Sequence, residues 1–173
     1  YAGITVQMLL SHRSGLPNYL YFMEAEKKNK EYINNIDVLD FLVTKKPNLS
    51  YSSGKRFNYC NTNFVLIALI IEKISGKTFP AFMQERVFGP LQMKNTFVFT
   101  LADTARATPT FKANGGFWQN DMTDGTYGDK NIYTTPQDLL KWDQALYTEQ
   151  FLSKAFLDSA FTLYSNERPS IHN

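Results

Sequence analysis

The segment Phe57-Asn58-Tyr59-Cys60-Asn61-Thr62-Asn63, followed by Phe64-Val65-Leu66-Ile67-Ala68-Leu69-Ile70-Ile71, carries the strongest structural signal in the chain. A continuous apolar run of this kind fits a buried strand or a buried helix, because periodicity alone does not separate the two. The flanking residues favour a helix, since Asn61 or Thr62 is a suitable N-cap and Gly76 stands where a left-handed C-cap is expected. At about fourteen residues, the segment is also longer than a typical strand. Because it is apolar on nearly every face, we expect a helix buried on all sides at the centre of a helical core.

The composition around this stretch is that of one ordinary domain, or of one lobe of a larger protein. The 173 residues are 43% hydrophobic and 15% aromatic, which is enough for a packed core. With 18 basic and 16 acidic residues, the net charge of +2 gives no support for nucleic acid or a membrane surface as partner. The single cysteine excludes an internal disulfide, and no stretch reaches the roughly eighteen apolar residues of a membrane span.

Further short helices are predicted by N-capping residues and by Gly or Pro stops. Asp37 is expected to cap a helix over residues 38–43, and Thr135 with Pro136 is expected to open another. Residues 97–99 are predicted to form a brief strand. Residues 101–131 contain glycines that interrupt every pattern, and they are predicted to form a long irregular loop. The predicted fold class is therefore mainly α with few short strands.

Four segments in register resemble one protein family. Residues 9–17 are similar to "LLSHTSGLP", and residues 57–62 to "F-x-Y-S-N-T", which contains a Tyr-x-Asn motif. Residues 90–96 resemble "PLGMKDT", and residues 128–139 resemble "G-x-x-G-x-x-S-T-x-x-D-L". On these motifs the chain is similar to the serine β-lactamase-like hydrolases, which include class C β-lactamases, penicillin-binding proteins acting as D-alanyl-D-alanine carboxypeptidases, and esterases. The resemblance implies the helical subdomain of the α/β + α β-lactamase/transpeptidase-like fold over residues 1–173.

The chemistry that this resemblance implies is acyl transfer to a serine, followed by release of the acyl group to water. By resemblance, Tyr59 relays the proton between nucleophile and leaving nitrogen, and Asn61 hydrogen-bonds the substrate amide. The family's Ser-x-x-Lys motif would precede Tyr1, and its Lys-Thr-Gly or His-x-Gly strand would follow Asn173. Since the chain has no initiator Met and ends abruptly, we interpret it as truncated at both ends. The resemblance implies that the parent protein is a serine hydrolase acting on an amide, β-lactam or ester bond. We expect residues 1–173 alone to be inactive, because they lack the nucleophile motif.

The rival hypothesis is a non-catalytic module of the same ancestry that binds cell-wall peptides or proteins. A Ser-x-x-Lys motif in the parent protein would favour the enzyme, and its absence would favour the module. The family implies a small-molecule or peptide substrate, no metal or organic cofactor, and a periplasmic, cell-surface or secreted location. An isolated lobe should also leave an exposed apolar patch around Tyr59. We therefore expect either self-association of the chain or partial disorder of the loop at residues 101–131.

Two apparent catalytic pairs are interpreted as structural. Ser52 and Lys55 match Ser-x-x-Lys literally, but Gly54 between them indicates a turn, whereas the catalytic motif needs a helix. Cys60 and His12 resemble a nucleophile pair, yet nothing in the sequence places them together, and cysteine is more often a small buried residue. His12 is expected to fix its own loop by hydrogen bonds.

The acids and aromatic residues of the loop are ambiguous. Asp121, Asp124 and Asp129 suggest calcium, but their spacing differs from an EF-hand, so we interpret them as solvated loop acids. Asn131 replaces the family's second glycine and is expected to take its positive φ, which Asn tolerates well. The aromatic residues of the loop either line a substrate cleft or anchor the loop, and both interpretations stay open: Phe117, Trp118 and Tyr127.

Overall fold

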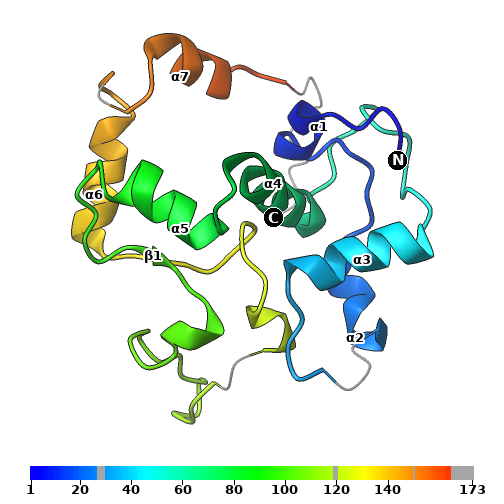
Figure 1. Cartoon of the computed structure of the whole chain (residues 1–173), viewed down its shortest axis with the longest axis horizontal. Helices are drawn as coiled ribbons and strands as arrows, with labels where there is room; N and C mark the ends of the chain where they lie inside the picture. The colour runs from blue at the N-terminus through cyan, green and yellow to red at the C-terminus, as the bar shows by residue number, and fades with distance from the viewer. Residues whose placement is uncertain (27–29, 119–120, 150, 165–173) are drawn as a thin grey trace.

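Helix α4 (Asn61–Ser75) lies at the centre of the molecule. The computed structural model describes residues 1–26, 30–118, 121–149 and 151–164. Helices α1 (Val6–Leu10) and α3 (Asn35–Lys45) lie on one side of α4, whereas α5 (Phe79–Met83) and α6 (Pro136–Ala145) lie on the other (Figure 1). No helix in the described ranges is both long and apolar enough to cross a membrane.

The remaining elements are short. They are η1 (Tyr19–Tyr21), α2 (Met23–Glu26), the π-helical turn η2 (Gln84–Phe88), η3 (Leu101–Asp103), η4 (Met122–Asp124) and α7 (Lys154–Ala160). One two-stranded sheet joins β1 (Phe97–Val98) to β2 (Ile132–Tyr133) in antiparallel register, with Phe97 opposite Tyr133. The mainly helical class with few short strands is confirmed. The second strand is not predictable from the sequence, because two residues are too few to show a period of two.

The two ends of α4 follow different rules. Its C-terminus is as predicted, since Gly76 takes a left-handed conformation with φ 68° and its N–H donates to Glu72 O at 2.9 Å. The predicted N-cap is wrong, because Cys60 occupies that position and Asn61 is the first helical residue. The hydroxyl of Thr62 does not cap the helix either, since it donates to a carbonyl oxygen of a distant loop.

The start of α3 also differs from the prediction. Asn34, and not Asp37, is the N-cap, and its Oδ1 accepts from the N–H groups of Ile36 and Asp37. Asp37 completes a capping box by accepting from Asn34 N at 3.0 Å. A reciprocal pair of this kind satisfies two end groups at once, so it is favoured over a cap by Asp37 alone.

The core consists of three apolar clusters that α4 and its N-cap hold together. Val65 belongs to a cluster with Tyr19 and Val38, and Ala68 belongs to a second cluster with α5, η2 and β1. Cys60 joins the third cluster, under the loop that follows α1. Each cluster therefore uses a different face or end of the helix.

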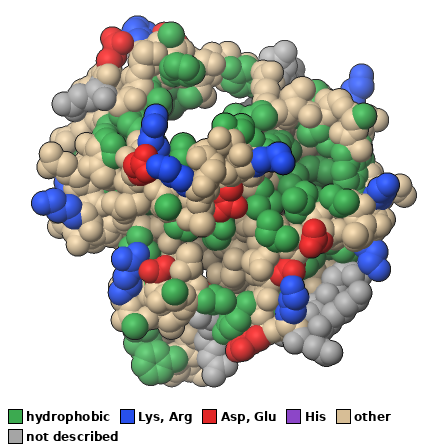
Figure 2. Space-filling view, viewed as in Figure 1, with side chains coloured by type: hydrophobic (Ala, Val, Ile, Leu, Met, Phe, Trp, Pro, Cys, Tyr) green, Lys and Arg blue, Asp and Glu red, His purple; other side chains and the backbone are tan. Residues whose placement is uncertain are grey.

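The prediction that α4 is buried on all sides is wrong for this chain. Ile74 is 81% exposed, and Leu69 and Ile70 are only half-buried. These two residues line an apolar groove of about 800 Å³ between α1, α3 and α4. Figure 2 shows hydrophobic side chains gathered over this region. The described elements cover only part of the helix surface, which leaves the groove open.

Candidate active site

Tyr59 and Asn61 flank the N-terminus of α4. The Tyr59 side chain is 60% exposed and that of Asn61 is half-buried, whereas Cys60 between them is buried. Cys60 has an extended backbone, in which neighbouring side chains point to opposite sides, so Tyr59 faces outward when Cys60 faces the core. The first turn of the helix adds N–H groups without intrahelical partners and the positive end of the helix dipole. The arrangement therefore presents a phenol and an amide beside a region that favours negative charge.

The ring of His12 lies against the ring of Tyr59. The two ring centroids are 4.5 Å apart, and His12 Nδ1 accepts from Cys60 N at 3.1 Å. A ring nitrogen that accepts carries no proton, so His12 is the neutral tautomer with its hydrogen on Nε2. Burial also lowers the pKa of His12. Its carbonyl oxygen accepts from Asn58 N at 2.9 Å, which confirms that His12 fixes the loop.

Cys60 is not arranged as a nucleophile. His12 does lie beside it, contrary to the sequence expectation, but the contact is to the Cys60 backbone. The Cys60 thiol donates to Leu16 O at 3.3 Å, and burial raises the pKa of this thiol. A buried thiol that stays protonated is a poor nucleophile. The interpretation of Cys60 as a small buried residue is therefore supported.

A buried polar junction attaches the loop after α1 to the first turn of α4. We define this polar junction by Ser14, Pro17, Tyr19, Thr62 and Asn63. Ser14 Oγ donates to Asn63 Oδ1 at 2.6 Å, and Thr62 Oγ1 donates to Pro17 O at 2.7 Å. Thr62 Oγ1 also accepts from Tyr19 N at 2.8 Å. The four side chains concerned have no exposed surface, so water cannot replace these bonds.

The Ser52–Lys55 segment is a turn, as predicted. Lys55 N donates to Ser52 O at 3.2 Å, and Gly54 N donates to Arg13 O at 2.7 Å. The Ser53 hydroxyl donates to Ser14 O at 2.8 Å. These contacts attach the turn to the loop that carries the polar junction, so the literal Ser-x-x-Lys match has a structural role.

Asp129 is not a solvated loop acid, and that interpretation is wrong for this residue. Its Oδ2 accepts from the Tyr19 hydroxyl at 2.9 Å, and the same hydroxyl lies 2.9 Å from Thr126 Oγ1. Asp129 Oδ1 is buried and has no hydrogen-bond partner in the described part of the chain. Burial raises the pKa of Asp129 and that of Tyr19. No pattern in the sequence indicates this pair, because its partners lie far apart in the chain.

The other two acids, Asp121 and Asp124, accept hydrogen bonds from backbone N–H groups at the start of η4. Asp121 is the N-cap of η4, and Asp124 completes its capping box by accepting from Asp121 N at 2.7 Å. Asp124 also pairs with Lys130 at 3.4 Å. Within the described ranges, no group of three His, Cys, Asp or Glu side chains is placed to hold a metal ion.

The glycine-type loop at residues 128–131 lies directly on α4. A Cβ at Gly128 would stand 2.5 Å from Phe64 O, so only glycine fits there. Asn131 has φ 71°, which confirms the expected positive value. Its Nδ2 donates to the carbonyl oxygens of Asp124 and Thr126, at 3.1 and 2.9 Å. The asparagine thus supplies both the backbone conformation of a glycine and two loop contacts.

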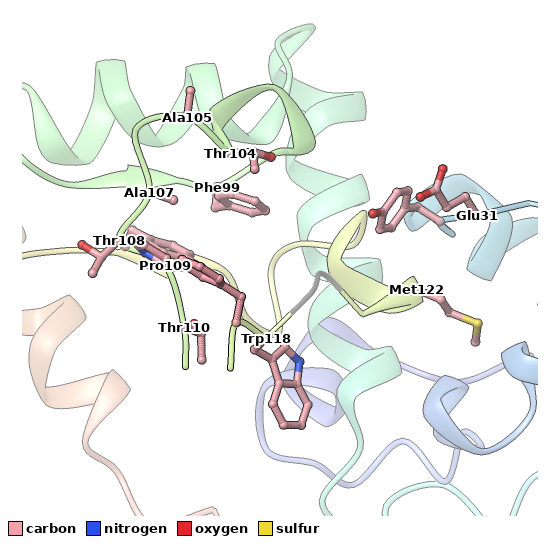
Figure 3. A pocket seen from close by; sticks show the side chains of 13 residues that line it. Glu31, Phe99, Thr104, Ala105, Ala107, Thr108, Pro109, Thr110, Trp118 and Met122 are labelled. Atoms are coloured by element: carbon pink, nitrogen blue, oxygen red, sulfur yellow. The ribbon is translucent and has the colours of Figure 1, made fainter. Parts of the chain in front are cut away.

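The loop aromatics divide between the two interpretations left open by the sequence. Tyr127 anchors the loop, because its hydroxyl donates to Glu72 Oε1 at 2.8 Å and its ring stacks on Phe79. Phe117 and Trp118 instead line a cavity of about 710 Å³, shown in Figure 3. The cavity is formed by the segment before α3, the ends of the two strands and the loop between η3 and η4.

Known proteins of one kind resemble this chain. The Beta-lactamase family model matches residues 1–170. Penicillin-binding protein 4* of Bacillus subtilis is 30% identical over 178 residues, covering 94% of this chain and 40% of that protein. The D-alanyl-D-alanine-carboxypeptidase/endopeptidase AmpH of Escherichia coli K12 is 25% identical over 152 residues, covering 88% and 38%. An octameric penicillin-binding protein homologue from Pyrococcus abyssi shares the fold, with a TM-score of 0.74, 23% identity and coverage of 93% and 39%. The chain spans about two fifths of these proteins.

Replacing Thr62 by Val should destabilise the chain by about 1–3 kcal/mol, because the buried Tyr19 N–H and Pro17 carbonyl lose their partner. Urea unfolding followed by circular dichroism measures this free energy. Thr44→Val is the matched control, since Thr44 bonds Asp40 O on an exposed helix surface and should change stability by under about 0.5 kcal/mol. Equal effects of the two substitutions would contradict the importance of the polar junction.

Replacing Asp129 by Asn should stabilise the chain at pH 7. A carboxyl whose pKa is raised on folding stabilises the folded state at low pH, and this contribution is lost as the pH rises through the folded-state pKa. The advantage of the Asp129→Asn variant should therefore vanish below pH about 3.9, where the carboxyl is protonated in both states. Urea midpoints between acid and neutral pH measure this, with the exposed Asp143→Asn as control. A stabilisation that grows toward low pH would refute the assignment.

Proposed function

This chain belongs to the Beta-lactamase family, and we propose that it is the helical lobe of a serine hydrolase that forms an acyl-enzyme on an amide, β-lactam or ester bond. The observation that carries the proposal is the exposed Tyr59 phenol at the N-terminus of α4, beside Asn61. The next residue, Cys60, is buried and its backbone N–H donates to His12 Nδ1. The names of the relatives, a penicillin-binding protein and a carboxypeptidase/endopeptidase, support this class of substrate.

The proposed reaction divides its groups between two lobes. A serine outside residues 1–173 attacks the carbonyl carbon, and its proton passes through the Tyr59 hydroxyl to the leaving nitrogen or oxygen as the old bond breaks. Water then attacks the acyl-serine ester and restores the serine. Asn61 holds the substrate amide by hydrogen bonds. His12 and the polar junction position Tyr59 and take no proton themselves.

The apolar groove supports the assignment as one lobe of a larger unit. Its lining includes the exposed side chain of Val43 and the half-buried side chain of Leu69. Exposed apolar patches commonly mark surfaces that contact another protein or domain. The relatives are about two and a half times as long as this chain, which leaves enough residues for an α/β lobe that covers the groove and carries the nucleophile. By resemblance to the family, we also propose that such an enzyme acts in the periplasm, at the cell surface or as a secreted protein.

Replacing Tyr59 by Phe in the full-length parent should slow acylation by a fluorescent penicillin by about 10²–10⁴-fold, because the proton relay is lost. Intact mass and peptide mapping locate the adduct, which we expect on a serine outside residues 1–173. Tyr147→Phe is the matched control, since Tyr147 is 82% exposed in the turn that follows α6 and its replacement should leave the reaction unchanged. Labelling of Ser52 or Cys60 would contradict the proposal. A parent inert to penicillins and to an ester panel would favour the non-catalytic module.

The apolar groove does not include Tyr59, around which the exposed patch was expected. We expect the isolated chain to self-associate through this groove, at concentrations that sedimentation velocity can follow. Val43→Lys places a charge in the groove and should weaken the association by about tenfold or more. Ile74→Lys is the matched control, because Ile74 is 81% exposed on α4 outside the groove lining. A chain that remains monomeric at high concentration would count against an uncovered packing surface.

A further inference from the structure

The charges of this chain are distributed unevenly along its sequence. All 16 acidic residues lie in residues 24–40 and 72–173, so that residues 1–23 and 41–71 contain none. We call residues 1–23 and 41–71 the acid-free segments. They nevertheless carry five basic residues, which are Arg13, Lys45, Lys46, Lys55 and Arg56. The net charge of +2 averages over the whole chain, so it does not reveal this basic part of the molecule.

Folding brings the two acid-free segments together at residues 51–56, which we call the basic turn. Gly54 N donates to Arg13 O at 2.7 Å, and Arg13 Nη2 donates to Gly54 O at 2.9 Å. A Cβ at Gly15 would stand only 2.2 Å from Tyr51 O, so the two backbones are in direct contact. The tertiary structure therefore places the charge of Arg13 beside the charges of the basic turn.

The two cations of the basic turn, Lys55 and Arg56, are available to a partner. Both side chains are exposed, and no acidic side chain of the described residues forms an ion pair with either of them. The Arg56 guanidinium lies over the ring of Tyr51, with its central carbon 4.7 Å from the ring centroid. Stacking uses the face of a guanidinium, so its N–H edge can still form two parallel hydrogen bonds with a carboxylate.

The composition of the basic turn favours an acidic peptide over a lipid surface or a nucleic acid. Ser52, Ser53 and Gly54 stand between Tyr51 and the two cations, so the turn has no aliphatic side chain to insert into a bilayer. Single-stranded nucleic acids gain much of their affinity from bases that stack on open aromatic rings. The one ring of the turn, Tyr51, is already covered by Arg56. Carboxylates need only the cations and hydroxyl groups that the turn offers.

We propose that the basic turn docks an acidic peptide segment of a partner protein, with Asp or Glu side chains at neighbouring positions. Arg56 holds one carboxylate by two hydrogen bonds, and Lys55 pairs with the next. Arg13, whose guanidinium is partly occupied by Gly54 O, adds its charge to the attraction. Because Arg56 is three residues from Tyr59, the docked partner lies beside the candidate active site. Only the importance of that placement rests on the proposed function.

The test is the fluorescence anisotropy of a labelled peptide of alternating Asp and Glu residues, titrated with the 173-residue chain. We expect saturable binding that weakens as salt is added, because exposed charges are screened, and no binding of the Asn and Gln version of the peptide. The double variant Lys55→Gln, Arg56→Gln should weaken binding by about tenfold, which is the combined range of two exposed ion pairs. Lys73→Gln with Lys94→Gln is the matched control, because it removes two exposed positive charges outside the acid-free segments.

Several outcomes would overturn the proposal. Absence of binding, equal binding of the acidic and neutral peptides, or equal effects of the two double variants would each do so. Tighter binding of polyphosphate or of phosphatidylglycerol vesicles, lost in the Lys55 and Arg56 variant, would assign the basic turn to phosphate or lipid instead. The variant Lys55→Arg, Arg56→Lys keeps both charges and should bind within about threefold of the unchanged chain, which separates loss of charge from loss of folding. No turnover is measured, so failure of this test is distinct from failure of the acylation test.

Discussion

The buried hydroxyl of Thr62 sets the position of the segments around the N-terminus of α4. It donates to Pro17 O and accepts from Tyr19 N, so one oxygen connects the first turn of α4 to the loop after α1. Ser14 and Asn63 form a second buried bond alongside it. Buried polar bonds of this kind contribute little net energy when made, but leaving one partner unpaired is costly. The loop therefore has one favourable position on the helix.

The polar junction explains how an exposed phenol is held in a defined place. The Tyr59 side chain is exposed, but the His12 ring lies against its ring and accepts from the backbone N–H of Cys60. The turn at residues 51–54 attaches to the same loop by further hydrogen bonds. A side chain supported in this way keeps its position without being buried.

The glycine-type loop extends the same logic to the other side of α4. Gly128 allows the backbone to approach Phe64, and Asn131 combines a positive φ with two hydrogen bonds. Tyr19 joins this loop to the polar junction, since its N–H binds Thr62 and its hydroxyl binds Asp129. The buried carboxyl is unfavourable when charged, so the loop gains position at some cost in stability. The apolar groove lies on the part of α4 that neither loop covers.

Short stretches of sequence were enough to predict the local features of this protein. The apolar run and Gly76 predicted the central helix and its end, and the spacing of four motifs predicted the family, because each signal lies within a few neighbouring residues. The positive φ of Asn131 was predictable for the same reason. Three features could be identified only from the tertiary structure. They are the N-cap of α4, the burial of Asp129 and the set of residues that lines the cavity with Phe117 and Trp118. Each depends on residues far apart in the chain. The Thr62 hydroxyl, for example, donates a hydrogen bond to Pro17 O, 45 residues away, and does not cap its own helix. Such contacts form only when folding brings the segments together, so no local pattern records them.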